Sequence, residues 1–247
     1  MKTNECTNLI IRTDSITIPE GTEEIGMSAF ADCTNLKEVK LPSTLREIGA
    51  CAFSNCINLK EVKLPSTLRR IGVHTFAGSG IEHLVIPEGV ERISDSVFYM
   101  CKNLKEVKLP STLRRIGVHA FTGSGIEQLV IPEGVERIGV CTFAGCTNLK
   151  EVKLSSTLEE IGMCAFAGCT NLKGVKLPST LREIGAYAFE GSGIEQLIIP
   201  EGIIFIDDWT FAGCKNLKEI KLPSTLREIG TGAFDGCENI EISREHI

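Results

Sequence analysis

Five side chains with the chemistry for catalysis or metal binding share one position of a repeated pattern: Cys51, His74, His119, Cys141 and Cys164. If the repeats stack, His74 lies beside Cys51 and His119 lies beside Cys141. A Cys–His contact can generate a nucleophilic thiolate, and the same side chains are common zinc ligands. However, no CxxC or HExxH spacing accompanies them, and no acid is placed to orient either histidine. We therefore keep a thiol or zinc site only as an alternative, and we predict no enzyme activity, no metal and no cofactor.

A second group of unusual residues lies toward the C-terminal end, where EGIIFIDDWTF stands in place of the EGVERIGVCTF or STLREIGACAF of other units. Ile204 and Phe205 stand in place of two charged residues, and Asp208 and Trp209, the only tryptophan, follow them. Tyr187 occupies the position of Trp209 one repeat earlier. Clustered exposed apolar side chains mark interaction sites, and Trp and Tyr are frequent hot-spot residues. We predict that these five residues contact a protein partner. The alternative is that Phe205 and Trp209 fold over each other to shield the last coils.

The eleven cysteines follow the repeat rather than a disulfide framework. Their number is odd, and the chain is much longer than small disulfide-stapled domains. Eight of them recur three residues after a phenylalanine or its equivalent, which predicts a column of buried thiols. Serine replaces this cysteine at Ser79, Ser124 and Ser192, so we do not expect obligatory pairing.

A repeat of 22 or 23 residues organises the whole chain. A phenylalanine anchors it ten times, and all nine prolines fall in one column, which Ser155 completes. The short units all carry GSGIE where the others carry a longer run such as GCTNLKE. The anchors are Phe30, Phe53, Phe76, Phe98, Phe121, Phe143, Phe166, Phe189, Phe211 and Phe234.

Each unit reads approximately NLKEVKLPSTLREIGxxAFxxC and predicts two extended segments. LKEVKLP alternates apolar and polar residues, which is typical of a strand with one buried face, and the proline ends it. STLREIG directs Leu and Ile inward as a second edge, and its glycine permits a corner. One unit cannot bury its own apolar face, so the stacked units must share a continuous core. We predict a single solenoid domain over 1–247, with partial caps at 1–18 and 238–247 and possible end-to-end self-association.

Charge and hydropathy disfavour several kinds of partner. The 247 residues carry a net charge of −6 with a pI near 5.4, so we expect no nucleic acid partner. No run of six consecutive apolar residues is present, so we expect no membrane insertion. Lysines and glutamates alternate on the expected strand faces without aromatic residues for base stacking, which favours a solvated, edge-protecting surface. The N-terminal residues lack the apolar segment of a secretory signal.

The unit LxxIxLPxxLxxIGxxAFxxCxx, from about Ile16 to Cys237, resembles the BspA-like (treponemal-type) leucine-rich repeat of bacterial and protozoan surface antigens. The resemblance implies a right-handed, β-rich leucine-rich-repeat solenoid, a horseshoe or rod with strands on its concave side. It also implies protein binding or cell adhesion, and a cell-surface or secreted location. The missing signal and the many thiols indicate instead the cytoplasm or a trimmed chain. A structural spacer within a larger surface protein and the thiol or zinc site stay open as alternatives.

Overall fold

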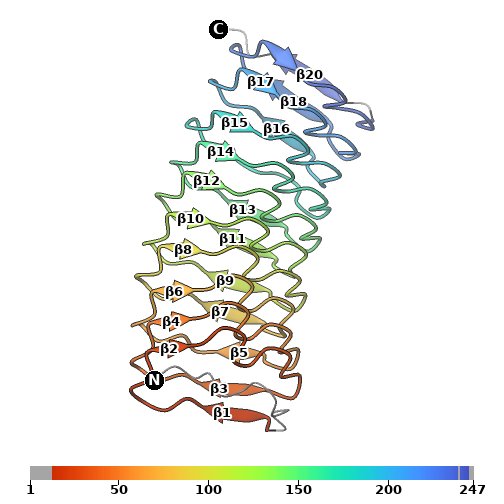
Figure 1. Ribbon diagram of the computed structural model, residues 1–247. Helices are drawn as coiled ribbons and strands as arrows, with labels where there is room; N and C mark the ends of the chain where they lie inside the picture. The colour runs from red at the N-terminus through yellow and green to blue at the C-terminus, as the bar shows by residue number, and fades with distance from the viewer. Residues whose placement is uncertain (1–12, 239, 245–247) are drawn as a thin grey trace. The chain divides into compact units, whose positions relative to one another are not determined.

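The computed structural model describes residues 13–238 and 240–244. The chain forms two compact units, Met1–Ile126 and Glu127–Ile247, and each is a stack of coils built from parallel strands (Figure 1). The predicted repeat solenoid is therefore confirmed, whereas the single domain over 1–247 stays a prediction. The described residues contain no helix, and so none that is long and apolar enough to cross a membrane.

The first strand of each coil comes from the LKEVKLP segment, as predicted. In the N-terminal unit these strands pair in parallel, so that Ile16 lies opposite Val39 and His83 opposite Glu106. They are β1 (Ser15–Thr17), β3 (Glu38–Lys40), β5 (Glu61–Val62), β7 (His83–Val85) and β9 (Glu106–Lys108). In the C-terminal unit they are β11 (Gln128–Val130), β13 (Glu151–Lys153), β16 (Gln196–Ile198), β18 (Glu219–Leu222) and β20 (Glu241–Arg244).

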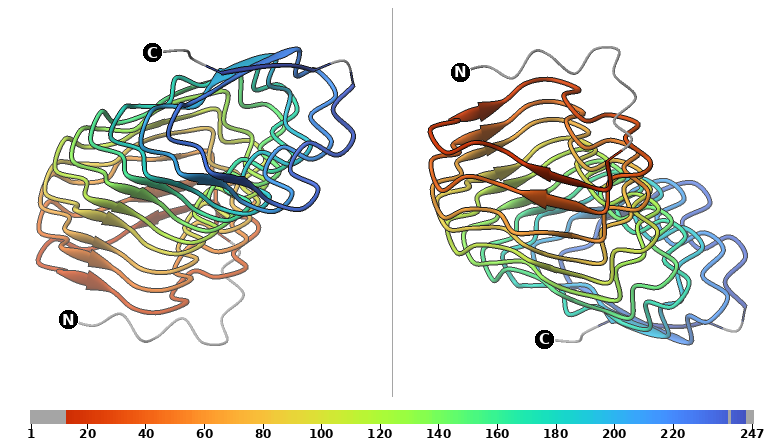
Figure 2. Two further views of the ribbon diagram at one scale, coloured as in Figure 1. Left: turned by 90° about the horizontal axis from the view of Figure 1, so that it is seen from above. Right: turned by 90° about the horizontal axis from the view of Figure 1, so that it is seen from below.

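The second edge, from STLREIG, forms a short strand on another side of each coil (Figure 2). Its isoleucine enters the core, and the residue before it faces solvent. In the N-terminal unit these strands are β2 (Glu24–Ile25), β4 (Glu47–Ile48), β6 (Arg70–Ile71), β8 (Arg92–Ile93) and β10 (Arg115–Ile116). In the C-terminal unit they are β12 (Arg137–Ile138), β14 (Glu160–Ile161), β15 (Glu183–Ile184), β17 (Phe205–Ile206) and β19 (Glu228–Ile229). The isoleucine of β19, Ile229, is the exception in this unit, because it is exposed.

The anchor phenylalanines form the core of each unit. Successive ring centroids from Phe30 to Phe121 are 5.1 to 6.0 Å apart, and those from Phe143 to Phe234 are 5.2 to 5.6 Å apart. The rings are stacked with their planes nearly parallel. Each coil therefore adds one ring to a continuous aromatic column inside its unit.

The terminal segments extend the strand ladder. β1 lies within the predicted cap 1–18, of which residues 1–12 are outside the described residues, and it pairs in register with β3. β20 lies within the predicted cap 238–247 and pairs with β18 along its length. Residues 239 and 245–247 of this cap are outside the described residues. End-to-end association stays a prediction.

One coil departs from the predicted pattern, because its residues 173–177 form no strand. Gly174 stands there in place of the usual glutamate. Glycine weakens a strand because it lacks a side chain to pack and loses more backbone freedom on ordering. A Cβ built at Gly174 would meet nothing within 4 Å. No neighbouring group therefore fills the space that a side chain at this position would occupy.

The three short units depend on the second glycine of GSG. The N–H of Gly80 donates to the carbonyl of Cys56 at 3.1 Å, and Gly193 makes the equivalent bond to Cys169 at 3.1 Å. A side chain has no room at these positions, because a Cβ would collide with a backbone carbonyl oxygen of the preceding coil. The missing residue is therefore absorbed by a close approach of two backbones, which only glycine permits.

A glutamate after each of four prolines holds the next coil. The carboxylate of Glu88 accepts the N–H of Ser111 at 3.1 Å and its hydroxyl at 3.0 Å. Glu201 accepts the same two groups of Ser224 at 2.7 and 3.1 Å. These serine donors lower the pKa of Glu88, Glu133 and Glu201 below the ordinary value of 4.5.

We predict that Gly193→Ala destabilises the protein by about 2–3 kcal/mol, because the new methyl group must push two coils apart. Gly174→Ala is the matched control and should change the free energy of unfolding by less than about 0.5 kcal/mol. Chemical denaturation monitored by circular dichroism measures both. Equal effects of the two substitutions would contradict the role assigned to the close backbone approach.

We also predict that stability falls as the pH is lowered below 4.5, the ordinary pKa of these carboxyls. A carboxyl with a lower pKa in the folded state contributes stability above its unfolded pKa and loses it as the pH drops through its folded pKa. The triple variant Glu88→Gln, Glu133→Gln, Glu201→Gln should therefore lose less stability between pH 7 and pH 3, as read from denaturation curves. Glu151→Gln, on an exposed strand face, should lose as much as the wild type.

Candidate functional site

The position two residues before each anchor is a left-handed corner of the coil. Its φ lies between 53° and 63° in ten coils, although only one of the ten residues is glycine. This conformation costs a non-glycine residue on the order of 1 kcal/mol. Hydrogen bonds between coils offset this conformational free energy. For example, the N–H of Trp209 donates to the carbonyl of Thr231 at 2.9 Å. The corner residues are Ser28, Cys51, His74, Ser96 and His119 in the N-terminal unit, and Cys141, Cys164, Tyr187, Trp209 and Gly232 in the C-terminal unit.

The rings of Tyr187 and Trp209 stack on this corner. Their centroids are 6.4 Å apart and their planes differ by 5°. On the other side of the indole, a Cβ added to Gly232 would lie 2.8 Å from two of its ring atoms. The indole therefore lies against a backbone that carries no side chain. Both aromatic side chains are half-buried, so part of each ring stays accessible to solvent.

Ile204 and Phe205 come shortly before Trp209 in the same coil and are exposed, with 51% and 46% of their surface accessible. Phe205 lies opposite Glu228 on the next coil. The coils on either side carry an Arg–Glu pair at these two positions, Arg182 with Glu183 and Arg227 with Glu228. The two apolar residues therefore interrupt two charged columns. Trp209 stacks on Tyr187 rather than on Phe205.

Asp208, the fifth predicted residue, makes a contact within the fold. Its Oδ1 accepts the N–H of Thr231 at 2.6 Å. Asp95 makes the equivalent contact with the N–H of Val118 at 3.1 Å in the N-terminal unit. The carboxylate of Asp208 therefore links two coils, and its presence is explained without a partner.

The predicted column of thiols lies against the anchor column. Cys56 donates to the carbonyl of Phe30 at 3.1 Å, and Cys101 donates to that of Phe76 at 2.9 Å. Burial raises the pKa of Cys56 to about 12 and that of Cys101 to about 11. Burial also raises the pKa of Cys169. These thiols are uncharged hydrogen-bond donors, not nucleophiles. Cys6 lies outside the described residues.

The Cys–His column provides no complete metal site among residues 13–238 and 240–244, where no three His, Cys, Asp or Glu side chains are grouped for a metal. The Nδ1 of His119 lies 3.2 Å from the hydroxyl of Thr122 in its own coil. Burial and the neighbouring Cys141 raise the pKa of Cys164 to about 11, which disfavours a thiolate. These observations give the thiol or zinc alternative no support.

Sequence reasoning missed two features that shape the surface. It did not recognise the left-handed corner, although the recurrence of Ser, Cys and His at one position was visible. It also overlooked a column of arginines, Arg70, Arg92 and Arg115, next to the one place in the N-terminal unit where Ser94 replaces the glycine of the Ile-Gly step. The run of consecutive arginines in a column that begins with Glu24 and Glu47 was the available signal.

Parallel short strands, an inward leucine and isoleucine pattern and a stacked anchor column together define a leucine-rich-repeat solenoid. The family model described as a BspA type leucine rich repeat region matches residues 4–124, 70–192 and 138–244. The chain therefore belongs to the BspA-type leucine-rich repeat family. No curated protein matches the chain.

Solved structures of the same class agree with this assignment. A leucine-rich repeat protein from Bacteroides ovatus is 27% identical with a TM-score of 0.50, over 92% of this chain and 78% of that one. A leucine rich cell surface protein from Faecalibacterium prausnitzii is 26% identical with a TM-score of 0.50, over 96% and 89% of the two chains. The pneumococcal vaccine antigen PcpA, 23% identical with a TM-score of 0.57 over 94% and 69%, shares the fold.

We predict that a thiol reagent at pH 8 modifies Cys51 faster than Cys56 or Cys101 in the folded protein. Cys51 is half-buried at a corner, whereas the other two thiols are buried and their pKa values are raised well above the ordinary 9.0. Mass spectrometry of alkylated peptides measures the three rates, and denatured protein, in which all three should react alike, is the control. Fast modification of Cys56 in the folded state would contradict this assignment.

Proposed function

We propose that this protein is a non-enzymatic protein-binding module, and that its partner contacts the aromatic shelf formed by Tyr187, Ile204, Phe205 and Trp209. The observation that carries the proposal is the exposure of Ile204 and Phe205 in the coil whose Trp209 stacks on Tyr187. Every other coil places charged residues at the two positions of Ile204 and Phe205. Apolar side chains are less favourable than charged ones on a surface that contacts only water, so their presence at this one place indicates an interaction site.

The corner geometry supports the binding role because it fixes the aromatic side chains before a partner arrives. The N–H groups of Tyr187 and Trp209 are bonded to the following coil at 3.1 and 2.9 Å. Gly232 leaves space for the indole. A preordered shelf loses little conformational entropy on binding, so more of the contact energy appears as affinity. Asp208 lies beside the shelf, and its carboxylate has further acceptor capacity for a polar rim contact.

An adhesion role at a cell surface is the corresponding biological proposal. It is supported by the family and by the relative from Faecalibacterium prausnitzii, which is described as a cell surface protein. The spacer alternative differs in one testable respect, because a spacer needs no partner of its own.

The double substitution Ile204→Arg, Phe205→Glu tests the proposal, since it restores the residues of the neighbouring coils and so should preserve the fold. We expect it to weaken partner binding by about 10-fold or more, as removal of an apolar hot spot does. The measurement is affinity capture from the native source, followed by calorimetric titration of the captured protein against wild type and variant.

The matched control is Val130→Glu with Met163→Arg, which makes the same chemical change at two other exposed apolar residues of the same unit. It should bind like the wild type. Equal binding by all three proteins would reject the shelf, and a wild type that captures no partner would favour the spacer.

A further inference from the structure

The pairing of the second strands is interrupted once in the N-terminal unit, between β6 and β8, which belong to different sheets. In neighbouring coils the carbonyl of the isoleucine accepts the N–H of the next coil's glycine, as Ile48 does from Gly72 at 2.8 Å. Ile71 instead accepts the hydroxyl of Ser94 at 2.6 Å. The backbone ladder is therefore replaced by a side-chain contact at this point.

Ser94 is the physical cause of the interruption. It occupies a column that is otherwise glycine in the N-terminal unit. A Cβ built at Gly72 would lie 2.5 Å from the N of Ala50, and one at Gly49 would lie 2.8 Å from the carbonyl carbon of Gly26. A residue with a Cβ fits here only if the strands separate. Ser94 therefore opens the ladder between its coil and the preceding one.

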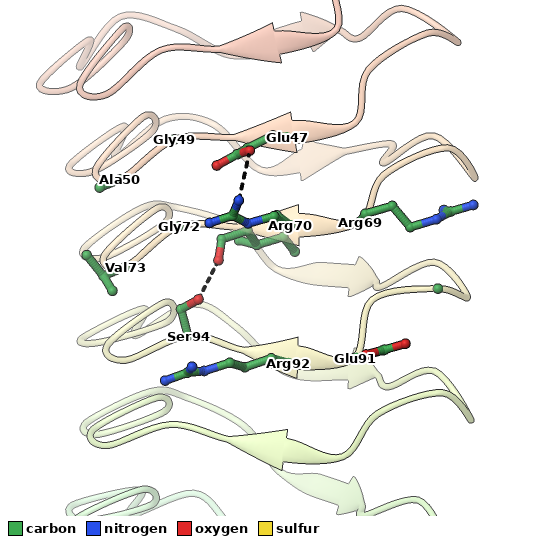
Figure 3. Close-up of a pocket in the computed structure, with 12 residues that line it drawn as sticks. Glu47, Gly49, Ala50, Arg69, Arg70, Gly72, Val73, Glu91, Arg92 and Ser94 are labelled. Atoms are coloured by element: carbon green, nitrogen blue, oxygen red, sulfur yellow. Dashed lines mark hydrogen bonds and ion pairs between the residues drawn. The ribbon is translucent and has the colours of Figure 1, made fainter.

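The separated strands border a groove of about 670 Å³. Arg70, Arg92 and Ser94 line it, and Figure 3 shows both arginines extending in the same direction along their strands, away from Arg69 and Glu91. Its volume lies within the range of about 300–1,000 Å³ that is usual for small-molecule sites. None of the described residues that line it is aromatic.

The arginine column beside the groove has an excess of positive charge. Arg70 is paired with Glu47 at 3.5 Å. Arg92 lies directly opposite Arg115 on β10, and neither has a carboxylate within ion-pair distance among the described residues. Like charges on directly opposed residues destabilise a sheet. A protein with a net charge of −6 thus keeps two exposed guanidinium groups without an ion pair, and one of them, that of Arg92, lines the groove.

The geometry points to a second binding site, in which Arg92 and Arg115, with Arg70, hold an acidic oligosaccharide whose anionic substituents are sulfates or carboxylates. Guanidinium groups bind both kinds of oxyanion in bidentate fashion. Register-paired strands place the two arginines about 4.8 Å apart, a spacing that suits successive anionic groups of a chain. The backbone groups of the open ladder supply hydrogen-bond partners for sugar hydroxyls.

Two observations favour an oligosaccharide over other polyanions. Without an aromatic lining, the groove provides no stacking surface for nucleic acid bases. The net negative charge of the chain disfavours a long, uniformly charged polymer, whereas a short acidic sugar meets only the local arginines. This site shares no residue with the aromatic shelf, so either proposal can fail while the other stands.

Isothermal titration at low salt tests the site with four probes: a sulfated heparin hexasaccharide, an oligogalacturonate, neutral maltohexaose and a hexaglutamate peptide. We expect the sulfated or the uronate sugar, or both, to bind, with affinity that falls as salt is raised. Preference between these two identifies the anionic group. Binding of neither sugar, binding of maltohexaose as tight as theirs, or tighter binding of the acidic peptide would overturn the proposal.

Arg92→Glu with Arg115→Glu should weaken sugar binding at least 10-fold. The control Lys215→Glu with Arg227→Glu changes the net charge equally in the other unit and should have little effect; an equal loss in the control would overturn the site. Ser94→Gly leaves the charge unchanged but allows the ladder to close, so it should raise stability and weaken binding. Unchanged binding in either Ser94→Gly or the arginine variant would also overturn the assignment.

Discussion

The distance between successive coils is the constraint on which the structure depends. Backbone hydrogen bonds at two strand edges and at the left-handed corner fix it, and the stacked phenylalanines fill the interior at the same spacing. Any additional atom between two coils would push them apart and disturb both the backbone hydrogen bonds and the phenylalanine stack. That is why glycine recurs where backbones touch, as at Gly72 and Gly193. The buried thiols of Cys56 and Cys101 fit the same spacing by donating to carbonyls of the previous coil.

Functional candidates arise where the constraint is relaxed. Ser94 in the N-terminal unit and Asp207 in the C-terminal unit both replace the glycine of the Ile-Gly step, and at both the second-strand sheet ends, between β6 and β8 and between β15 and β17. The residues that follow each break differ: arginines near Ser94, and an apolar pair with tryptophan near Asp207. A side chain that costs ladder hydrogen bonds gives no advantage to the core.

Much of this architecture was readable from the sequence, because the repeat fixes which residues recur and two-residue alternation fixes which face the core. The parallel strands, the phenylalanine column and the buried cysteines follow from that pattern. The lost strand at Gly174 was not anticipated, since one glycine in a strand is a local energetic effect that periodicity does not register. The left-handed corner was also missed: Cys, Tyr and Trp have no preference for positive φ, and the hydrogen bonds from neighbouring coils impose it.

The aromatic shelf shows how much of the candidate site residue identity alone can predict. Sequence singled out five residues because they broke the pattern, and four of them are at least partly accessible. Tyr187 and Trp209 stack on each other, and Ile204 and Phe205 are exposed. The fifth, Asp208, breaks the pattern for a different reason, since its carboxylate bonds the next coil as Asp95 does. Departure from a repeat therefore marks two kinds of position: those that repair the spacing after a local change, and those that leave side chains unmatched within the fold. Only contacts between coils separate the two, and the unmatched side chains are the ones available to a partner.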